Sequence, residues 1–248
     1  MIKEELAADA AIYLSVVAAV AGGATRPADI ASRAGMDGRV VSRYLDQLRR
    51  LHVVEHLAPA EASETSRRGI WRLADHYLRS WFEFVRANRT DLEAHRAELV
   101  FRSRIRDRLD EFVSRPAFED AAREHARRSI GLDPEYPARA TVGAWWGPVP
   151  DERHPGTRRT READVDIAGY DRRRLVLAGE AKWSKGPEAG AALEQLRRII
   201  VYVPGYDGGN TKLVLYARDG FTEALRARVR AEGVILRTVA DLYSASDP

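Results

Sequence analysis

Hydrophobic positions in the first part of the chain recur with the period of a helix, three times over. Apolar side chains return every three to four residues from Glu4 to Val20, which is typical of a helix with one buried face. Gly22 and Gly23 end that pattern. Two more helical patterns follow, over "RPADIASRAG" (26–35) and "GRVVSRYLDQLRRLHVV" (38–54). We therefore expect three consecutive helices.

The third helix separates apolar from polar side chains. Its expected buried stripe consists of Val40, Val41, Tyr44, Leu45 and Leu48. Arg39, Ser42 and Arg43 lie largely outside that stripe. The next segment, 53–75, predicts two short strands joined by a polar loop that ends in Arg67 and Arg68.

Three helices followed by a two-stranded hairpin are typical of a winged helix-turn-helix, which we expect over residues 1–75. In that arrangement the third helix enters the major groove of DNA, and the loop between the strands touches backbone phosphates. The candidate DNA-binding residues are Arg39, Ser42, Arg43, Arg67 and Arg68. The alternative is a winged helix used only for protein contacts or as a spacer.

Beyond this region the pattern predicts a helical linker over 76–115 and a second domain over 116–248. The order of elements in the second domain is α-β-β-β-α-β-α-β, which predicts an α/β (overall α+β) fold with a mixed sheet flanked by helices. Its first strand is expected at 138–146, followed by a loop at 147–161. Its last strand is expected at 234–242.

Composition narrows the classes of function. The 248 residues are 45% hydrophobic and 31% charged, which is usual for a folded globular protein. The absence of cysteine excludes disulfides and thiolate metal sites, and it is compatible with a cytoplasmic protein. The apolar run at 10–24 is too short to span a bilayer, so we expect no membrane association. A net charge of +3 does not by itself indicate a polyanionic partner.

The stretch "ADVDIAGYDRRRLVLAGEAKW" (163–183) carries the candidate chemistry. Side chains in a strand alternate between its two sides, so Asp164 and Asp166 are expected on one face. The same alternation places Val165 and Ile167 together on the other face. The stretch therefore begins as a strand with one acidic side.

The second half of this stretch predicts a returning strand. A hairpin that turns at 172–173 sets Asp166 opposite Gly179. Glu180 and Lys182 are two residues apart, so they share a face of the returning strand. Two carboxylates and an ammonium then converge at one edge of the sheet.

Carboxylates that lie side by side raise each other's pKa unless a cation neutralises them. Carboxylate oxygens suit Mg²⁺ or Mn²⁺, either of which activates water and stabilises charge on a phosphodiester. Lysine is rare here, with four lysines among 40 basic residues, so Lys182 is informative: an amine positions a nucleophile or exchanges a proton with it. The alternative is an exposed hairpin that is merely charged.

The triplet of Asp166, Glu180 and Lys182 resembles the motif of the PD-(D/E)xK phosphodiesterase fold. The likeness covers about residues 116–243. It implies a restriction-endonuclease-like domain in which these three residues are catalytic and the two carboxylates bind the metal.

The same resemblance implies two further site residues. An acidic residue on the first helix of that fold often completes the metal site, and Glu119 stands at the corresponding place. Gln195 in "LEQLRRI" resembles the helix glutamine of many members. Both are candidate catalytic residues, and Glu119 is also a candidate metal ligand.

A wider resemblance extends over nearly the whole chain. The three N-terminal helices, "WRLADHYLRSWFEFVRANR" (71–89), "VGAWWG" (142–147) and the acidic hairpin are similar to the C-terminal half of the archaeal-type ATPase family. Those proteins join a P-loop NTPase to a winged helix and a nuclease-like domain. This chain has no G-x-x-x-x-G-K-[ST] motif, so the resemblance implies that any ATPase is a separate polypeptide.

These features predict a magnesium-dependent DNA endonuclease or DNA-processing protein. Arg158, Arg159 and Arg161, as well as 172–174 in the turn, are placed to contact phosphates, although a solvated charged loop is an equal alternative for either cluster. The competing prediction is a DNA-binding regulator or adaptor that does not cleave and works with a separate ATPase. An RNA substrate also stays open, because phosphodiester chemistry is shared.

Overall fold

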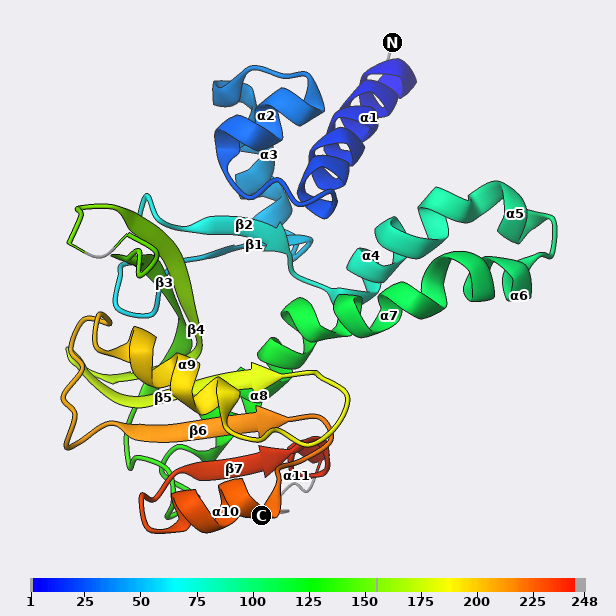
Figure 1. Cartoon of the computed structure of the whole chain (residues 1–248). Helices are drawn as coiled ribbons and strands as arrows, with labels where there is room; N and C mark the ends of the chain where they lie inside the picture. Colours follow the sequence, from blue (N-terminus) through cyan, green and yellow to red (C-terminus); the bar gives the residue numbers. More distant parts are fainter. Residues whose placement is uncertain (1, 155, 244–248) are drawn as a thin grey trace. The chain divides into compact units, whose positions relative to one another are not determined.

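The computed structural model describes residues 2–154 and 156–243 and divides the chain into two compact units (Figure 1). Unit 1 comprises 1–58 and 62–107, and unit 2 comprises 59–61 and 108–248. The boundary at 107 and 108 lies inside the helical segment that the sequence separates as a linker. None of the described helices is long and apolar enough to cross a membrane.

Unit 1 begins with the three helices and two antiparallel strands that the sequence predicts. They are α1 (Ile2–Ala21), α2 (Pro27–Ala34), α3 (Gly38–Arg50), β1 (Val54–Leu57) and β2 (Ile70–Leu73). Gly35 ends α2 in the left-handed conformation, with φ of 67°. The Asp37 side chain begins α3 by accepting a hydrogen bond from the backbone N–H of Arg39.

The buried stripe of α3 forms much of the core of unit 1. Val41, Tyr44, Leu45 and Leu48 are buried, whereas Val40 is 39% exposed. The expectation for Val40 was wrong because successive helix positions are about 100° apart, which leaves Val40 about a quarter-turn from the centre of the stripe.

The rest of unit 1 is helical, as predicted. The α-helical pieces are α4 (His76–Ser80), α5 (Arg89–Glu93), α6 (Ala97–Val100) and the start of α7 (Arg106–Phe112). Wider π-turns at Trp81–Val85 and Phe101–Ile105 interrupt them, with a short 3₁₀ turn at Arg86–Asn88. Phe82 packs against the core of unit 1.

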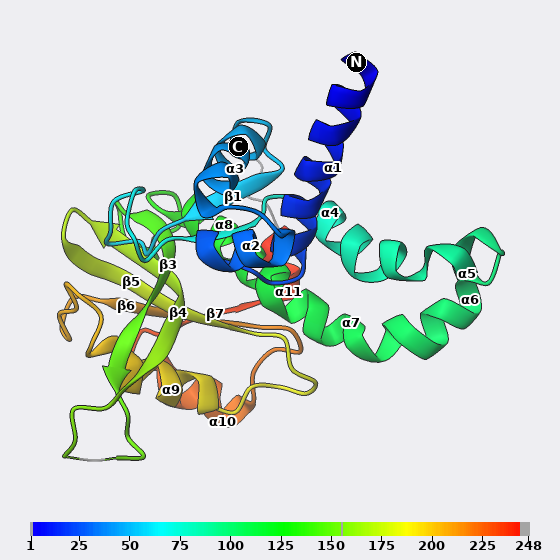
Figure 2. The same ribbon diagram turned by 90° about the horizontal axis from the view of Figure 1, so that it is seen from above.

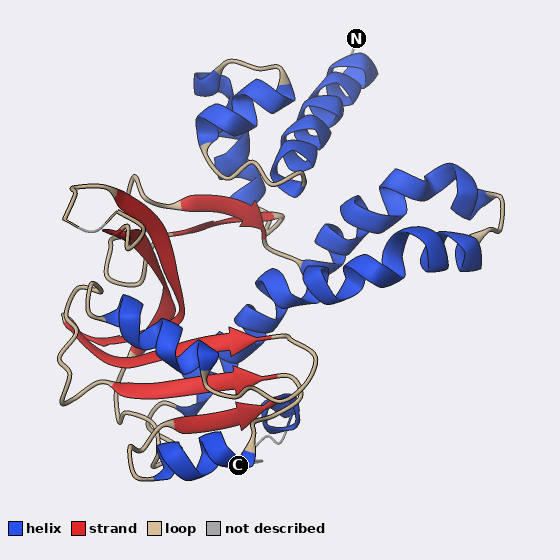
Figure 3. Cartoon of the chain, in the orientation of Figure 1, coloured by secondary structure: helices blue, strands red, loops and turns tan. Residues whose placement is uncertain are grey.

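Unit 2 is a mixed five-stranded sheet with helices on both faces, which confirms the α/β expectation (Figure 3). The strand order is β3-β4-β5-β6-β7; β3 to β5 are antiparallel, and β5 to β7 are parallel. The strands are β3 (Thr141–Pro150), β4 (Thr160–Asp171), β5 (Arg174–Lys182), β6 (Lys212–Ala217) and β7 (Ile235–Thr238). The helices are α8 (Glu119–Ser129), α9 (Ala191–Ile200), α10 (Glu223–Arg230) and α11 (Val239–Tyr243).

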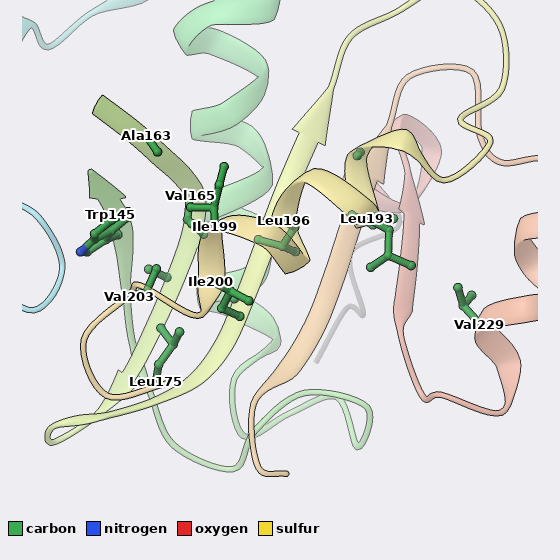
Figure 4. Close-up of a cluster of buried hydrophobic side chains, with 14 of the residues drawn as sticks. Trp145, Ala163, Val165, Leu175, Leu193, Leu196, Ile199, Ile200, Val203 and Val229 are labelled. Carbon is green, nitrogen blue, oxygen red and sulfur yellow. The ribbon is translucent and has the colours of Figure 1, made fainter. Parts of the chain in front are cut away.

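Two hydrophobic clusters hold the helices to the sheet. Residues of α9 and α10, including Leu196 and Ile199, pack on one face against Val165 and its neighbours (Figure 4). Residues of α8 and α11 pack on the other face around Ile167 and Tyr216. Figure 2 shows α9 and α10 on one side of the strands and α8 on the other.

Two boundaries in unit 2 differ from the expectation. The loop predicted at 147–161 is shorter, because β3 continues to Pro150 and buries Val149 in the core. The last strand ends at Thr238 and not at residue 242. There the Asp241 side chain accepts hydrogen bonds from the backbone N–H and hydroxyl of Thr238, which favours a helical turn over further strand.

Candidate active site

The candidate site lies where β4 and β5 diverge. The last β4–β5 pair on this side is Ile167 with Gly179. Beyond this pair the Asp166 side chain links the two strands: its Oδ2 accepts a 2.9 Å hydrogen bond from the Ala181 backbone N–H. Arg123 Nη1 donates to the Asp166 carbonyl oxygen over 2.8 Å. These bonds hold a carboxylate that is only 3% exposed.

The expected pairing of Asp166 with Gly179 was wrong by one residue. Between Gly169 and Tyr170 the register shifts, because β5 contains a bulge at Val176. One extra residue in the returning strand moves Ile167 into the place expected for Asp166.

A second bulge overturns the expected alternation in β4. Val165 pairs with Trp145 and Ala168 pairs with Gly143, so two residues of β4 stand opposite one residue of β3. As a result Val165 and Ile167 lie in clusters on opposite faces of the sheet and not together. Asp166 lies within this bulge, and the β4–β5 register begins one residue later, at Ile167.

Glu180 and Lys182 lie together on β5, as predicted. Lys182 Nζ donates a 2.7 Å hydrogen bond to Glu180 Oε1. Glu180 is 2% exposed, and its Oε2 is buried without a hydrogen-bond partner among the described residues. Gly179 permits this arrangement, because a Cβ there would lie 2.7 Å from the Val214 carbonyl oxygen of β6.

Glu119 and Asp164 complete an acidic cluster, defined here as Glu119, Asp164, Asp166 and Glu180. Glu119 begins α8, and its Oε1 lies 3.1 Å from Arg115 Nε. Arg115 Nη2 lies 3.5 Å from Asp164 Oδ2. The charges of Asp164 and Asp166 act on the pKa values of both Glu119 and Glu180, so they connect the two glutamates.

Arg115 and Arg123 are site residues that sequence reasoning missed. Arg123 is four residues after Glu119 on α8, so the two face one side of that helix, and this spacing was the available signal for Arg123. Arg115 precedes α8 in an extended conformation, with φ of −133° and ψ of 127°, and helix spacing does not apply to it. Arg123 is buried and also bonds the Asp120 side chain, so it ties α8 to β4.

The acidic cluster disfavours its own negative charge. Burial, and then the nearby Asp166 carboxylate, raises the pKa of Glu119 to about 7. Burial, and then Asp166, also raises the pKa of Glu180, to about 8. Burial raises the pKa of Asp166 too. Such a cluster gains stability from any cation that neutralises it.

Lys182 stays charged in this site. Burial by itself lowers its pKa, but the carboxylates of Glu180 and Asp166 outweigh burial, and the pKa is raised overall. Of the two roles expected for this amine, positioning of the nucleophile is therefore favoured over proton exchange.

The donor chemistry of the cluster fits a divalent cation. Its ligands are carboxylate oxygens, which Mg²⁺ and Mn²⁺ prefer, and Glu180 Oε2 is a buried oxygen in need of a partner. Within the part of the chain that the structure describes, however, no three Asp, Glu, His or Cys side chains are gathered closely enough to hold a metal ion. Ammonium and guanidinium groups neutralise the carboxylates instead.

Gln195 and the arginines of the β3–β4 loop lie apart from these contacts. Gln195 is half-buried on α9 and makes no hydrogen bond with the acidic cluster in the described part of the chain. Arg158 is exposed, and Arg159 Nη1 lies 3.1 Å from His154 Nε2 in the same loop. Arg161 is half-buried and is the second residue of β4.

The candidate DNA-binding residues lie in unit 1. Arg39, Ser42 and Arg43 are exposed on one side of α3. Arg67 is exposed in the β1–β2 loop, and Arg68 beside it is half-buried. Arg26 Nη1 donates to the carbonyl oxygens of Arg67 and Gly69, so this loop is anchored to the start of α2.

Comparison with known proteins gives a family match over part of the chain and no function. Residues 81–195 match the model of a family described as archaeal and bacterial proteins of unknown function. No curated protein matches the chain. The crystal structure of protein VC1899 from Vibrio cholerae is similar over 85% of this chain and 41% of its own, with 12% identity and a TM-score of 0.32. The chain thus spans less than half the length of that protein.

The family match is consistent with the resemblance to the archaeal-type ATPase family noted in the sequence. The description of that family names neither an ATPase nor a nuclease activity.

Proposed function

We propose that the protein is a metal-dependent DNA phosphodiesterase of the PD-(D/E)xK type. The observation that supports this most is the burial of Asp166 and Glu180 beside Glu119, with the Lys182 ammonium 2.7 Å from Glu180. Burying several carboxylates together costs stability, and carboxylates with raised pKa values are found most often at functional sites. The group therefore favours a functional role over a purely structural one.

The proposed reaction is hydrolysis of a phosphodiester. Asp166, Glu180 and Glu119 would hold Mg²⁺ or Mn²⁺, which would supply Lewis acidity and lower the pKa of a bound water. The Ala181 N–H orients the Asp166 carboxylate, and the Arg123 bond to the Asp166 carbonyl fixes its backbone. The Lys182 ammonium stabilises negative charge that develops on the phosphate.

Unit 1 is proposed to hold the duplex as a winged helix. Arg39, Ser42 and Arg43 present an exposed polar surface on α3, which is the third helix of the unit. Arg67 and Arg68 lie in the loop that would form the wing. The arginines at positions 158, 159 and 161 add a second basic segment in unit 2 for phosphate contact.

The DNA-binding part of the proposal predicts a change in salt dependence. Arg39→Ala combined with Arg43→Ala should weaken binding to duplex DNA about tenfold or more, and it should reduce the slope of log K against log salt by about 2, because each contact releases counterions. Fluorescence anisotropy at several salt concentrations measures both quantities.

A matched control is Arg89→Ala with Arg102→Ala, which removes the same charge from two exposed arginines of the helical segment. Equal binding by the Arg39 and Arg43 variant and the wild type at every salt concentration would show that α3 does not anchor DNA.

The cleavage assay tests the proposed function itself. Wild-type protein is incubated with supercoiled plasmid, linear duplex, single-stranded DNA and RNA, each with Mg²⁺, Mn²⁺ or EDTA. We expect DNA products with either metal and none with EDTA. Cleavage of RNA alone would replace the DNA substrate by RNA, and cleavage in EDTA would contradict the metal-dependent mechanism.

A second function is supported by two observations. The described residues hold no ready-made group of three metal ligands, and Lys182 occupies one oxygen of Glu180. A regulator or adaptor that binds DNA without cutting it, and acts with a separate ATPase, needs no such group. DNA binding without cleavage under every condition would favour this alternative.

A further inference from the structure

Arg115 is the cation that faces the outer carboxylates of the acidic cluster. It immediately precedes the turn into α8, and its guanidinium bridges Glu119 at 3.1 Å and Asp164 at 3.5 Å. The Asp166 and Glu180 carboxylates also act on its charge. One residue therefore connects α8 with β4 at the candidate metal site.

The other cations near the cluster already have partners. Lys182 is bonded to Glu180 Oε1. Arg123 is bonded to the Asp120 side chain and to the Asp166 backbone, not to the Asp166 carboxylate. Arg115 differs from Arg123 in exposure, because its side chain is 63% exposed whereas that of Arg123 is 11% exposed. A side chain this exposed leaves its partners without disrupting a packed core.

We propose that Arg115 acts as a built-in counter-cation that neutralises the acidic cluster in the metal-free protein and competes with the divalent metal for it. This inference rests on the proposed function, since it assumes that the cluster takes Mg²⁺ or Mn²⁺. A guanidinium between Glu119 and Asp164 repels an incoming cation and occupies oxygens that the cation needs. Metal binding requires Arg115 to move away from Glu119.

The consequence is opposite to that of losing an ordinary site residue. Removal of Arg115 should strengthen metal binding, because a competing charge is lost while every carboxylate ligand remains. It should also destabilise the metal-free protein, because the carboxylates then repel one another without compensation. Removal of a residue that merely supports the fold would instead lower both the stability of the protein and its affinity for the metal.

The test is a titration of the intact chain with Mn²⁺ alone, in which the electron paramagnetic resonance signal reports free Mn²⁺. Arg115→Gln should bind Mn²⁺ about three- to tenfold more tightly than the wild type. Arg115→Lys retains the charge and should stay close to the wild type. The control Arg128→Gln removes another exposed arginine, which lies on α8 and pairs with Glu124 outside the cluster, and should leave the affinity unchanged.

Thermal unfolding with and without Mn²⁺ provides an independent measurement. The rise in melting temperature on adding Mn²⁺ should be larger for Arg115→Gln than for the wild type. An Arg115→Gln protein that folds only when Mn²⁺ is present would also support the proposal. Equal or weaker Mn²⁺ affinity in Arg115→Gln would overturn the role of Arg115 while leaving the metal site intact. Absence of Mn²⁺ binding in every variant would overturn the proposed function together with it.

Discussion

Lys182→Ala and Asp166→Asn should each reduce metal-dependent DNA cleavage by about a hundred- to a thousandfold. Lys182 supplies the ammonium beside Glu180, and loss of one donor that stabilises charge in a transition state costs about a hundred- to a thousandfold in rate. Asp166→Asn removes a negative ligand while keeping the shape of the side chain, so it should also weaken metal binding.

Initial rates of plasmid nicking under saturating Mg²⁺ measure the effect. Lys185→Ala is a matched control, since Lys185 is three residues away, 81% exposed and paired with Asp110. Asp171→Asn is the control for the carboxylate, because Asp171 is exposed at the far end of β4. Cleavage by Lys182→Ala at the wild-type rate would show that Lys182 takes no part in the reaction and would contradict the proposed site on the β4–β5 hairpin.

The metal-free protein should become less stable as the pH rises from about 5 to about 8.5. The pKa of Glu119 is raised to about 7 and that of Glu180 to about 8, so in this range the folded state binds more protons than the unfolded state. Stability then falls with pH, by up to about 1.4 kcal/mol per pH unit for each group. The contribution is fully present below the usual glutamate pKa and is lost above the raised values.

Urea unfolding in EDTA at several pH values measures this dependence. Glu180→Gln, which is neutral at every pH, should flatten the decline and be more stable than the wild type at pH 8.5. The exposed Glu152→Gln is the control and should retain the wild-type slope. A wild-type protein whose stability rises between pH 5 and 8.5 would contradict the raised pKa values of Glu119 and Glu180.

These two predictions separate chemistry from electrostatics. Loss of cleavage in Lys182→Ala tests what the site does, whereas the pH dependence tests only how its carboxylates are buried. If the protein shows the pH dependence but no cleavage, the acidic cluster is buried as described, and the non-cleaving, DNA-binding alternative is favoured.

The order of helices and strands could be predicted from the sequence because it depends on local periodicity. The stripe of Val41, Tyr44, Leu45 and Leu48 follows from helix geometry, and the cap at Gly35 follows from the freedom of glycine. The shared face of Glu180 and Lys182 required only the two-residue period of a strand. Spacing along the chain was sufficient for each of these features.

Register was not predictable in this way. The bulges at Val176 and in the middle of β4 leave no local mark, because the register of a strand is set by the strands that pair with it. A shift of one residue changes which face a side chain occupies, so the surroundings of Asp166 depended on these bulges.

The sequence alone determined which residues are candidates for chemistry, namely Asp166, Glu180, Lys182 and, through resemblance, Glu119. Only the tertiary structure decided that Arg115 and Arg123 join them and that Lys182 stays charged. The physical reason is range. Helix and strand periods act over a few residues, whereas burial, charge and ion pairing depend on groups that meet only when α8 packs against the sheet.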